Sequence, residues 1–392
     1  MPPDIETLAA RSRHDLLRRN AVLETFFQRE APRLARACHE MSRRFLAGGR
    51  LWAFGSGAAA ATDAQHVAVE FIHPIIVGKR ALPASDLGVD FEARIAVLVE
   101  PNDMVIGFSP APDPAAERAL TTARAGGALT FGLVGAAAEY AFDRPDADPF
   151  VCQEVFEVLY HVLWETVHVY FEHREQGHDV GASAFLYPML GKQAQPLDHV
   201  VTEVQVSMRQ KAEQVNRLRT AAADTEADSL ARMAGAICAR LERGGRLIAF
   251  GNGGSATDAN DLVADCVIPP SGWRPVPALS LAAEPANITA LANDIGTDAI
   301  FTRQLMAHAR PADVAVAIST SGGSANLLAA LAQARAQGLL TVGILGYDGG
   351  RIVSDHLADH TIIVRSDYVP RIQEVQASLY HVLRARILDA RL

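Results

Sequence analysis

The stretch that decides the fold is "RGGRLIAFGNGGSATDANDL", residues 243–262. Four apolar residues, Leu247 to Phe250, lead directly into a run of glycines, and a helical pattern follows. A short apolar run bounded by glycine is typical of a buried strand, and the pattern after it predicts a crossover helix. The glycines allow backbone N–H groups to approach an anion at the start of that helix.

The same pattern occurs twice in the chain. "AGGRLWAFGSG" at 47–57 matches "RGGRLIAFGNG" at 243–253, an offset of 196 residues in a chain of 392. Two further matches follow in the same order, "ALTTARAGGALTFGLVG" (119–135) with "ALAQARAQGLLTVGILG" (330–346), and "QEVFEVLYHVL" (153–163) with "QEVQASLYHVL" (373–383). Three matches in one order indicate a tandem duplication.

Within each half, short apolar runs alternate with helical segments. This alternation predicts parallel strands with crossover helices, a three-layer α/β/α sandwich in each half. Residues 174–200 contain Gly, Pro and Ser and have no clear periodicity at their start, so the predicted domains are 1–180 and 196–392. Residues 199–222 are expected to form the opening helix of the second domain.

Composition and charge exclude several function classes. The formal charge of −9 argues against a nucleic-acid binder that neutralises phosphates with an excess of Lys and Arg. The four cysteines are widely spaced without a CxxC pair, which indicates neither a disulfide framework nor a structural zinc site. The N-terminus mixes acids and bases, and no long apolar run occurs, so we expect a cytoplasmic protein without a membrane partner.

A second loop suits a phosphate. "ISTSGGSAN" (318–326) again follows an apolar run and opens a helix, so hydroxyls gather beside free N–H groups. Two such loops favour a phosphate monoester over the alternative, in which the serines and glycines are only N-caps and turn residues. The predicted phosphate-binding residues are Gly253, Gly254, Ser255, Ser319, Thr320, Ser321 and Ser324.

Four motifs carry a family resemblance. "GNGGS", "ANDIGTDAIFTRQL" (292–305), "ISTSGGSAN" and "RIQEVQASLYHVL" (371–383) resemble, in this order, the phosphoheptose isomerases of the sugar-isomerase (SIS) superfamily. The first half resembles them more distantly. The resemblance implies flavodoxin-like domains, tetramers with sites between subunits, and isomerisation of sedoheptulose 7-phosphate to a heptose 7-phosphate. It also implies that Asn252, Asp294 and Gln373 contact the sugar phosphate.

The resemblance further implies a metal and acid/base set on two helices. In the family, a His and a Glu lie four residues apart on the helix after the glycine loop. A Gln and a His lie eight residues apart on the last helix of the domain, so each pair shares a helical face. The matching residues are His66, Glu70, Gln153 and His161 in the first half, and Asp261, Asp265, Gln373 and His381 in the second.

The cofactor expected at this set is a divalent metal, zinc by resemblance. Asp261 is a harder ligand than the imidazole it replaces, so zinc affinity should be lower in the second half. The alternative for the first half is that His161 is a satisfied core histidine and Glu70 an exposed helix charge.

The first half keeps the metal-type residues but lacks the hydroxyl-rich phosphate loops. Its glycine loop runs into Ala58 to Ala61, and "FSPAPDPAAE" (108–117) has prolines and Asp113 where the serines stand, so phosphate binding is not expected there. These complementary losses suggest that the halves specialise, the second holding the sugar phosphate and the first lending its metal-type residues to one composite site.

The expected reaction moves a proton between C1 and C2 through an enediol. Glu70 is assigned as base and His161 as acid/base partner, with Asp265 and His381 as equivalents if the second half acts alone. The sequence departs from the family pattern at two places that bear on substrate identity. The family has an arginine shortly after its Glu, where this chain has Pro269, or Pro74 in the first half. The family's Asp before "RIQE" is Pro370 here.

Two other functions stay open. One is a non-catalytic sugar-phosphate sensor or protein-binding scaffold, since some relatives of this family bind a replication initiator protein and isomerise nothing. The other is an isomerase or epimerase of a different phosphosugar. A homodimer of tandem chains is expected, because four domains would complete a closed arrangement.

Overall fold

The computed structural model describes residues 4–73, 79–133, 137–175 and 197–390. The chain forms two compact units. We call Ala21–Gln214 the N-unit, and Met1–Asn20 together with Val215–Leu392 the C-unit. The predicted boundary between 180 and 196, and Pro74, lie outside the described residues, and the domain limits 1–180 and 196–392 stay a prediction.

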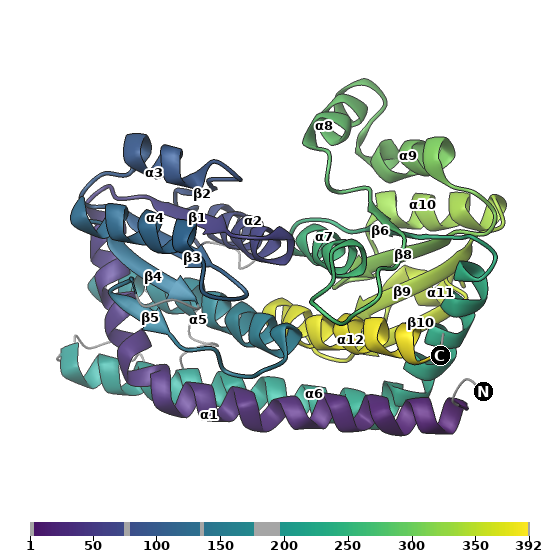
Figure 1. Cartoon of the computed structure of the whole chain (residues 1–392), viewed down its shortest axis with the longest axis horizontal. Coiled ribbons are helices and arrows are strands. Elements are labelled where there is room, and N and C mark those ends of the chain that lie inside the picture. The colour runs from purple at the N-terminus through teal and green to yellow at the C-terminus, as the bar shows by residue number, and fades with distance from the viewer. Residues whose placement is uncertain (1–3, 74–78, 134–136, 176–196, 391–392) are drawn as a thin grey trace. The chain divides into compact units, whose positions relative to one another are not determined.

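The elements of the first half alternate as the repeat predicts (Figure 1). They are α1 (Ile5–Leu46), β1 (Leu51–Gly55), α2 (Ala58–Ile72), β2 (Ala84–Asp86), α3 (Phe91–Leu98), β3 (Met104–Phe108), α4 (Pro114–Ala125), β4 (Leu129–Leu133), β5 (Tyr140–Phe142) and α5 (Pro149–Glu175).

The second half repeats this order with additional short helices. Its elements are α6 (Leu197–Leu241), β6 (Leu247–Phe250), α7 (Gly254–Val267), β7 (Ala278–Ser280), α8 (Pro285–Asp294), the 3-10 turn η2 (Thr297–Ala299), α9 (Ile300–His308), β8 (Val314–Ser319), α10 (Ala325–Ala336), β9 (Leu340–Gly346), α11 (Gly350–Ser354), β10 (His360–Val364) and α12 (Val369–Asp389).

Each unit is built on a sheet of five parallel strands. The strand order is β2-β1-β3-β4-β5 in the N-unit and β7-β6-β8-β9-β10 in the C-unit. Strand for strand this is the same 2-1-3-4-5 order, which is that of flavodoxin-like folds. The prediction of a duplicated flavodoxin-like α/β/α sandwich with parallel sheets is therefore confirmed.

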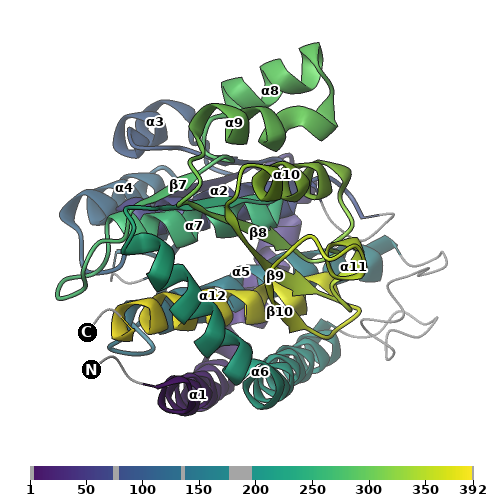
Figure 2. The ribbon, with the colours of Figure 1, turned by 90° about the vertical axis from the view of Figure 1, so that its right-hand side faces the viewer.

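The strands are buried on both faces because helices cover both. Every residue of β3, β4, β8 and β9 is buried, as their uninterrupted apolar sequences predict for parallel strands. In the N-unit, α4 and α5 lie on opposite faces of the sheet, and α2 packs on α5 (Figure 1). In the C-unit, α10 and α12 cover opposite faces, and α7 packs on α12 (Figure 2).

The two units exchange the beginnings of their long helices. The first part of α1, up to Asn20, belongs to the C-unit, where Asp15 accepts a hydrogen bond from Arg386 at 2.8 Å. The first part of α6, up to Gln214, belongs to the N-unit, where Lys211 lies 2.5 Å from the carboxylate of Glu165 on α5. The sequence predicted opening helices but not which unit each would complete.

No helix of the described residues is both long enough and apolar enough to cross a membrane.

Candidate functional site

Strand order places the candidate site of the C-unit at the carboxyl ends of its central strands. The chain leaves β6 for the outer strand β7 and returns to β8 on the other side of β6. In open parallel sheets, ligands bind outside the carboxyl ends of the strands at such a reversal. The two loops predicted to bind phosphate follow β6 and β8, so both lie at this point.

The first loop leads from β6 into α7 and depends on glycine at two positions. Gly253 has a φ of 56°, a conformation that L side chains rarely adopt. A Cβ atom on Gly251 would lie 2.3 Å from the carbonyl oxygen of Ser255 and 2.8 Å from that of Ile318. Ser255 itself is buried in the first turn of α7. The backbone can therefore approach a ligand closely at the helix N-terminus.

The second loop leads from β8 into α10 and is ordered by its own hydroxyls. Ser319 Oγ accepts a hydrogen bond from the Gly322 N–H at 3.0 Å, and Ser321 Oγ accepts one from the Gly323 N–H at 3.3 Å. Ser324 is the N-cap residue of α10. Thr320 is half-buried in the same loop.

The two loops are joined by a pair of side chains. Asn252 of the first loop and Asn326 of α10 exchange two amide hydrogen bonds, each 2.9 Å long. The predicted loop residues are thus neighbours in space, as the strand order requires. Asn326 was not predicted, although it ends the quoted motif "ISTSGGSAN".

Replacing Gly251 with alanine is expected to weaken phosphate binding. The added Cβ would collide with two backbone carbonyls, and such overpacking costs about 1–3 kcal/mol. If the loop moves to relieve the collision, a loss of this size in binding free energy raises the Kd for a phosphate about 5- to 150-fold. Isothermal titration with inorganic phosphate measures the change. The control is Gly235→Ala in α6, where a Cβ meets nothing within 4 Å and should leave binding unchanged. Equal affinity of Gly251→Ala and wild type would contradict the assignment of this loop.

In the N-unit, a carboxylate lies at the N-terminus of α4, the helix that corresponds to α10. Asp113 is the N-cap residue of α4, and its Oδ1 accepts a hydrogen bond from the Ala115 N–H at 2.9 Å. Ser56 of the first loop donates its hydroxyl to Asp113 Oδ2. These two hydrogen bonds lower the pKa of Asp113, so the carboxylate is ionised at the position where the helix N-terminus would favour an added anion.

A buried acid/base set lies between α7 and α12 of the C-unit. His381 Nε2 is 3.1 Å from Asp265 Oδ2 and 3.5 Å from Asp261 Oδ2. Tyr380 donates its hydroxyl to Asp261 at 2.8 Å. Burial, followed by the charge of Asp261, raises the pKa of Asp265 to about 7, while His381 opposes the shift. A carboxyl group with this pKa is suited to proton transfer near neutral pH. Gln373, also predicted, is buried on α12 two turns before His381.

The N-unit brings together three of its four predicted residues. His66 Nε2 lies 3.7 Å from Glu70 Oε1, and the rings of His66 and His161 have centroids 5.2 Å apart. Tyr160 contacts His66 Nδ1 at 3.0 Å through its hydroxyl. The amide N–H of the fourth residue, Gln153, donates to the carbonyl oxygen of Ala59 at 3.4 Å, and its role as a ligand stays a prediction.

Both sets have the donor atoms that a metal ion requires. The potential ligand atoms of His66, Glu70 and His161 lie within 4.8 Å of one another, as do those of Asp261, Asp265 and His381, and all six side chains are buried. Two imidazoles and a carboxylate form a donor set that zinc commonly takes. Two carboxylates and one imidazole form a harder set, better suited to other divalent ions. The choice of zinc remains a prediction.

Two other predicted features lie at the surface. Asp294 is exposed at the end of α8, where Asn293 donates to it at 2.7 Å, and none of the hydrogen bonds of the described residues joins it to the two loops. Pro269 follows α7, and the nearby Arg274 is exposed.

Comparison with known proteins decides the family. The family model for the SIS domain matches residues 212–346. The phosphoheptose isomerase of Rhodospirillum rubrum is 41% identical over 165 residues, which are 42% of this chain and 87% of that protein. The chain belongs to the SIS-domain family. A phosphoheptose isomerase of Solidesulfovibrio magneticus is 46% identical to this SIS-domain protein over 144 residues, 36% of this chain and 69% of the relative.

Several solved structures resemble the SIS-domain protein over almost its full length. The C-terminal domain of glucosamine-fructose-6-phosphate aminotransferase from Francisella tularensis covers 96% of this chain and 94% of its own, with a TM-score of 0.61 and 8% identity. At this identity the likeness concerns the fold alone, and it extends over both SIS domains.

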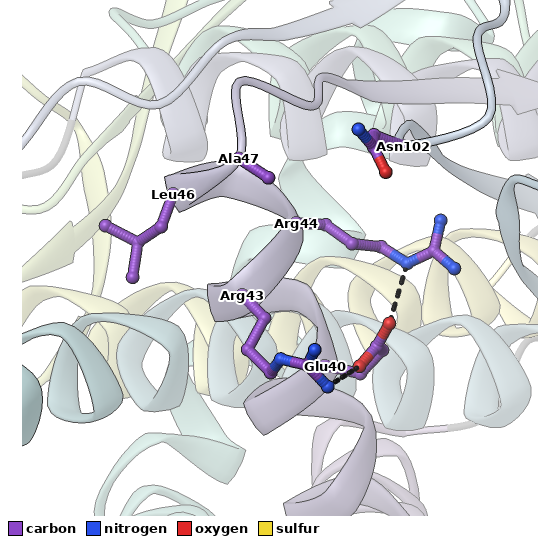
Figure 3. A pocket seen from close by; sticks show the side chains of 6 residues that line it. All are labelled: Glu40, Arg43, Arg44, Leu46, Ala47 and Asn102. Carbon is purple, nitrogen blue, oxygen red and sulfur yellow. Dashed lines mark hydrogen bonds and ion pairs between the residues drawn. The ribbon is translucent and has the colours of Figure 1, made fainter.

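A cavity of about 350 Å³ is lined by residues at the end of α1 and by Asn102, shortly before β3 (Figure 3). Its basic residues have structural partners. Arg44 donates to the carbonyl oxygens of Pro101, Asp103 and Gly127, which precede β3 and β4. Arg240 of the C-unit makes the equivalent bonds to Pro311 and Gly338. We therefore interpret Arg44 and Arg240 as equivalent structural arginines, each of which holds the segments before two strands of its own domain.

Sequence reasoning missed the two tyrosines that contact the acid/base sets. Tyr160 and Tyr380 occupy the same place in the repeated segment "LYHVL", immediately before the predicted histidines. Tyr160 contacts His66 on α2, and Tyr380 contacts Asp261 on α7, so each hydroxyl meets the first predicted residue of the helix after the glycine loop. The repetition of this segment in both SIS domains was the available signal.

Proposed function

We propose that this protein is an aldose–ketose isomerase of a phosphosugar and that the C-unit carries its site. The observation that supports this most strongly is that one unit contains both hydroxyl-rich loops and the buried Asp265–His381 pair. The relatives that share its sequence are phosphoheptose isomerases, which favours sedoheptulose 7-phosphate as substrate and a heptose 7-phosphate as product.

The loops would hold the phosphate group. The N-termini of α7 and α10 direct backbone N–H groups and positive dipole ends toward an anion, and the loop hydroxyls can bond its oxygens. Asn252 and Asn326 bond each other at 2.9 Å, so a bound sugar would exchange one of these amide bonds for a bond to its own hydroxyl. Asp294 and Gln373 remain proposed sugar contacts.

Asp265 and His381 would perform the proton transfer. The Asp265 carboxylate removes the proton from C1 of the ketose, which yields an enediol, and the proton returns to C2 to give the aldose. His381, 3.1 Å away, exchanges a proton with the carbonyl and hydroxyl oxygens of the substrate. Tyr380 holds Asp261 by its hydrogen bond, which fixes the second carboxylate beside the pair.

The N-unit set would hold a divalent ion. His66, Glu70 and His161 are buried and mutually close, and zinc suits such ligands. A bound divalent ion supplies polarisation of a carbonyl oxygen. The alternative roles of Glu70 as base and His161 as its partner, in a composite site with the C-unit loops, stay a prediction that variants in the two halves can test.

The deciding experiment measures isomerisation directly. Purified full-length protein, with zinc added or removed by chelation, is incubated with sedoheptulose 7-phosphate in D₂O and followed by NMR. Deuterium incorporation at C1 together with aldose formation is the expected result. Exchange with another phosphoketose but not with sedoheptulose 7-phosphate would keep the reaction and change the substrate. Binding without exchange would instead favour a non-catalytic phosphosugar sensor or scaffold, in which a phosphate loop lost to Asp113 in the N-unit would be tolerated.

Size-exclusion chromatography with light scattering tests the remaining partner proposal. A homodimer of tandem chains is expected, with four SIS domains in one assembly. A monomer that is active would contradict it.

The pKa of Asp265 predicts pH effects of opposite sign on activity and stability. Since burial raises this pKa to about 7, kcat should rise about tenfold per pH unit below pH 7 and become constant above it. The folded-state pKa exceeds the unfolded value, so the stabilising contribution is complete below about pH 4 and is lost as the pH rises through 7. Rates and urea unfolding at pH 5 and 8, compared with Asp265→Asn, measure both effects. A flat rate profile between these values would contradict the prediction.

A further inference from the structure

A buried arginine connects the acid/base helices of the C-unit. Arg384 lies on α12, one turn beyond His381, and its side chain is 0% exposed. Its Nε donates to the carbonyl oxygen of Asp265 at 3.3 Å, and its Nη2 donates to that of Arg274 at 2.7 Å. The guanidinium carbon lies 5.0 Å from the centroid of the Trp273 ring. One side chain thus binds the last turn of α7 and the segment that follows it.

The duplication shows that the fold does not require a charge here. The segment "LYHVLR" of α12 corresponds to "LYHVLW" of α5, so Trp164 takes the place of Arg384 in the N-unit. Trp164 is buried too, with its ring 5.4 Å from that of His168. Removing a guanidinium from water costs several kcal/mol before its partners compensate. The arginine occurs in the half that also has the serine-rich loops and the carboxylate pair, which indicates a role in that site.

One contact of Arg384 is to the backbone of Asp265 itself. Asp265 is in the last turn of α7, where carbonyl oxygens carry the negative end of the helix dipole and favour a cation. The hydrogen bond from Arg384 joins α12, which carries His381, to the turn of α7 that carries Asp265. Pro269, which stands where the family's arginine is expected, belongs to the segment that Arg384 holds.

We propose that Arg384 is a positioning residue of the isomerase site, which holds the Asp265 carboxylate against His381 and fixes the segment containing Trp273. The proposal rests on the proposed function of the C-unit for its effect on turnover. Because the phosphate loops lie at the other end of α7, Arg384 should affect the proton-transfer step and not the binding of the phosphate.

The test compares Arg384→Met with a matched control, Arg335→Met, which removes an arginine from an ion pair with Asp359 at the surface of the same unit. In Arg384→Met we expect kcat to fall about 100-fold, as for a misplaced catalytic group, with KM changed less than threefold. The control should keep both values. A folded Arg384→Met with kcat within twofold of wild type, or with KM and kcat changed alike, would overturn the proposal.

A second readout separates this proposal from the proposed function. The ring resonances of His381, assigned by their loss in His381→Gln, report its placement against Asp265 without substrate. They should shift in Arg384→Met and stay unchanged in Arg335→Met. If Arg384→Met does not fold, Arg384→Lys is measured in its place, since it retains the charge but not the two-sided contact. Unchanged His381 resonances would refute the positioning role, whereas shifted resonances in a protein that isomerises nothing would refute only the proposed function.

Discussion

The Asp265→Asn variant is expected to turn over sedoheptulose 7-phosphate about 1,000-fold more slowly than wild type, because a positioned general base contributes about 10²–10⁴-fold. Asparagine keeps the shape of the side chain but cannot accept a proton from C1. Its neighbours Asp261 and His381 stay in place, and the phosphate loops are untouched. Binding of the sugar phosphate, measured by titration calorimetry, should therefore remain within threefold of wild type.

The matched control for this variant is Glu70→Gln, which makes the same chemical change in the N-unit. If the C-unit carries the base, Glu70→Gln lowers turnover far less than Asp265→Asn, and its main effect is on the bound metal content. The reverse ranking would assign the base to Glu70 and favour the composite site. Equal and full activity of both variants would remove both carboxylates from the mechanism.

The largest effect on stability is expected from Lys211→Met. Lys211 and Glu165 lie 2.5 Å apart with side chains 5% and 0% exposed. Removing one charge of a buried pair typically lowers the free energy of unfolding by about 3–5 kcal/mol, because the remaining charge stays buried and loses the attraction of its partner. Since Lys211 lies in the exchanged part of α6, the loss should loosen that segment from the N-unit. Urea unfolding followed by tryptophan fluorescence, with Trp52 and Trp164 in the N-unit, measures the change.

The control is the double variant Lys211→Met with Glu165→Leu. Replacing both charges by apolar groups should recover most of the lost free energy of unfolding, since a buried pair is often no better than a well-packed apolar contact. If the single variant unfolds at the urea concentration of wild type, the pair contributes nothing and the attachment of α6 rests on its apolar residues alone.

The sequence could predict the parts of this protein that depend on local pattern. Short apolar runs followed by glycine loops predicted parallel strands, and the repeated "GGRL" segment predicted that the sandwich occurs twice. Spacings of four and eight residues placed Asp261, Asp265 and His381 on facing helix surfaces, and the structure brings them together.

Other features depend on contacts between distant segments, which leave no local pattern. Helical periodicity predicts that α1 and α6 are helices, but it cannot show that each begins in one unit and ends in the other. The hydrogen bond of the Gln153 amide to the carbonyl oxygen of Ala59 joins residues far apart in the chain, so helical spacing could not predict it. The contacts of Arg384 are to backbone oxygens, whose positions no residue type reveals.

The exchanged helix beginnings have a consequence for synthesis on the ribosome. Residues 4–20 are translated long before residues 215–392, the rest of the unit to which they belong. At about 5–20 residues per second, their partners emerge only after tens of seconds. During that time Leu8, Ala9 and Leu16, which are buried in the finished protein, have no folded surface to pack on. A nascent chain of this protein therefore depends on whatever shields its first helix until translation is complete.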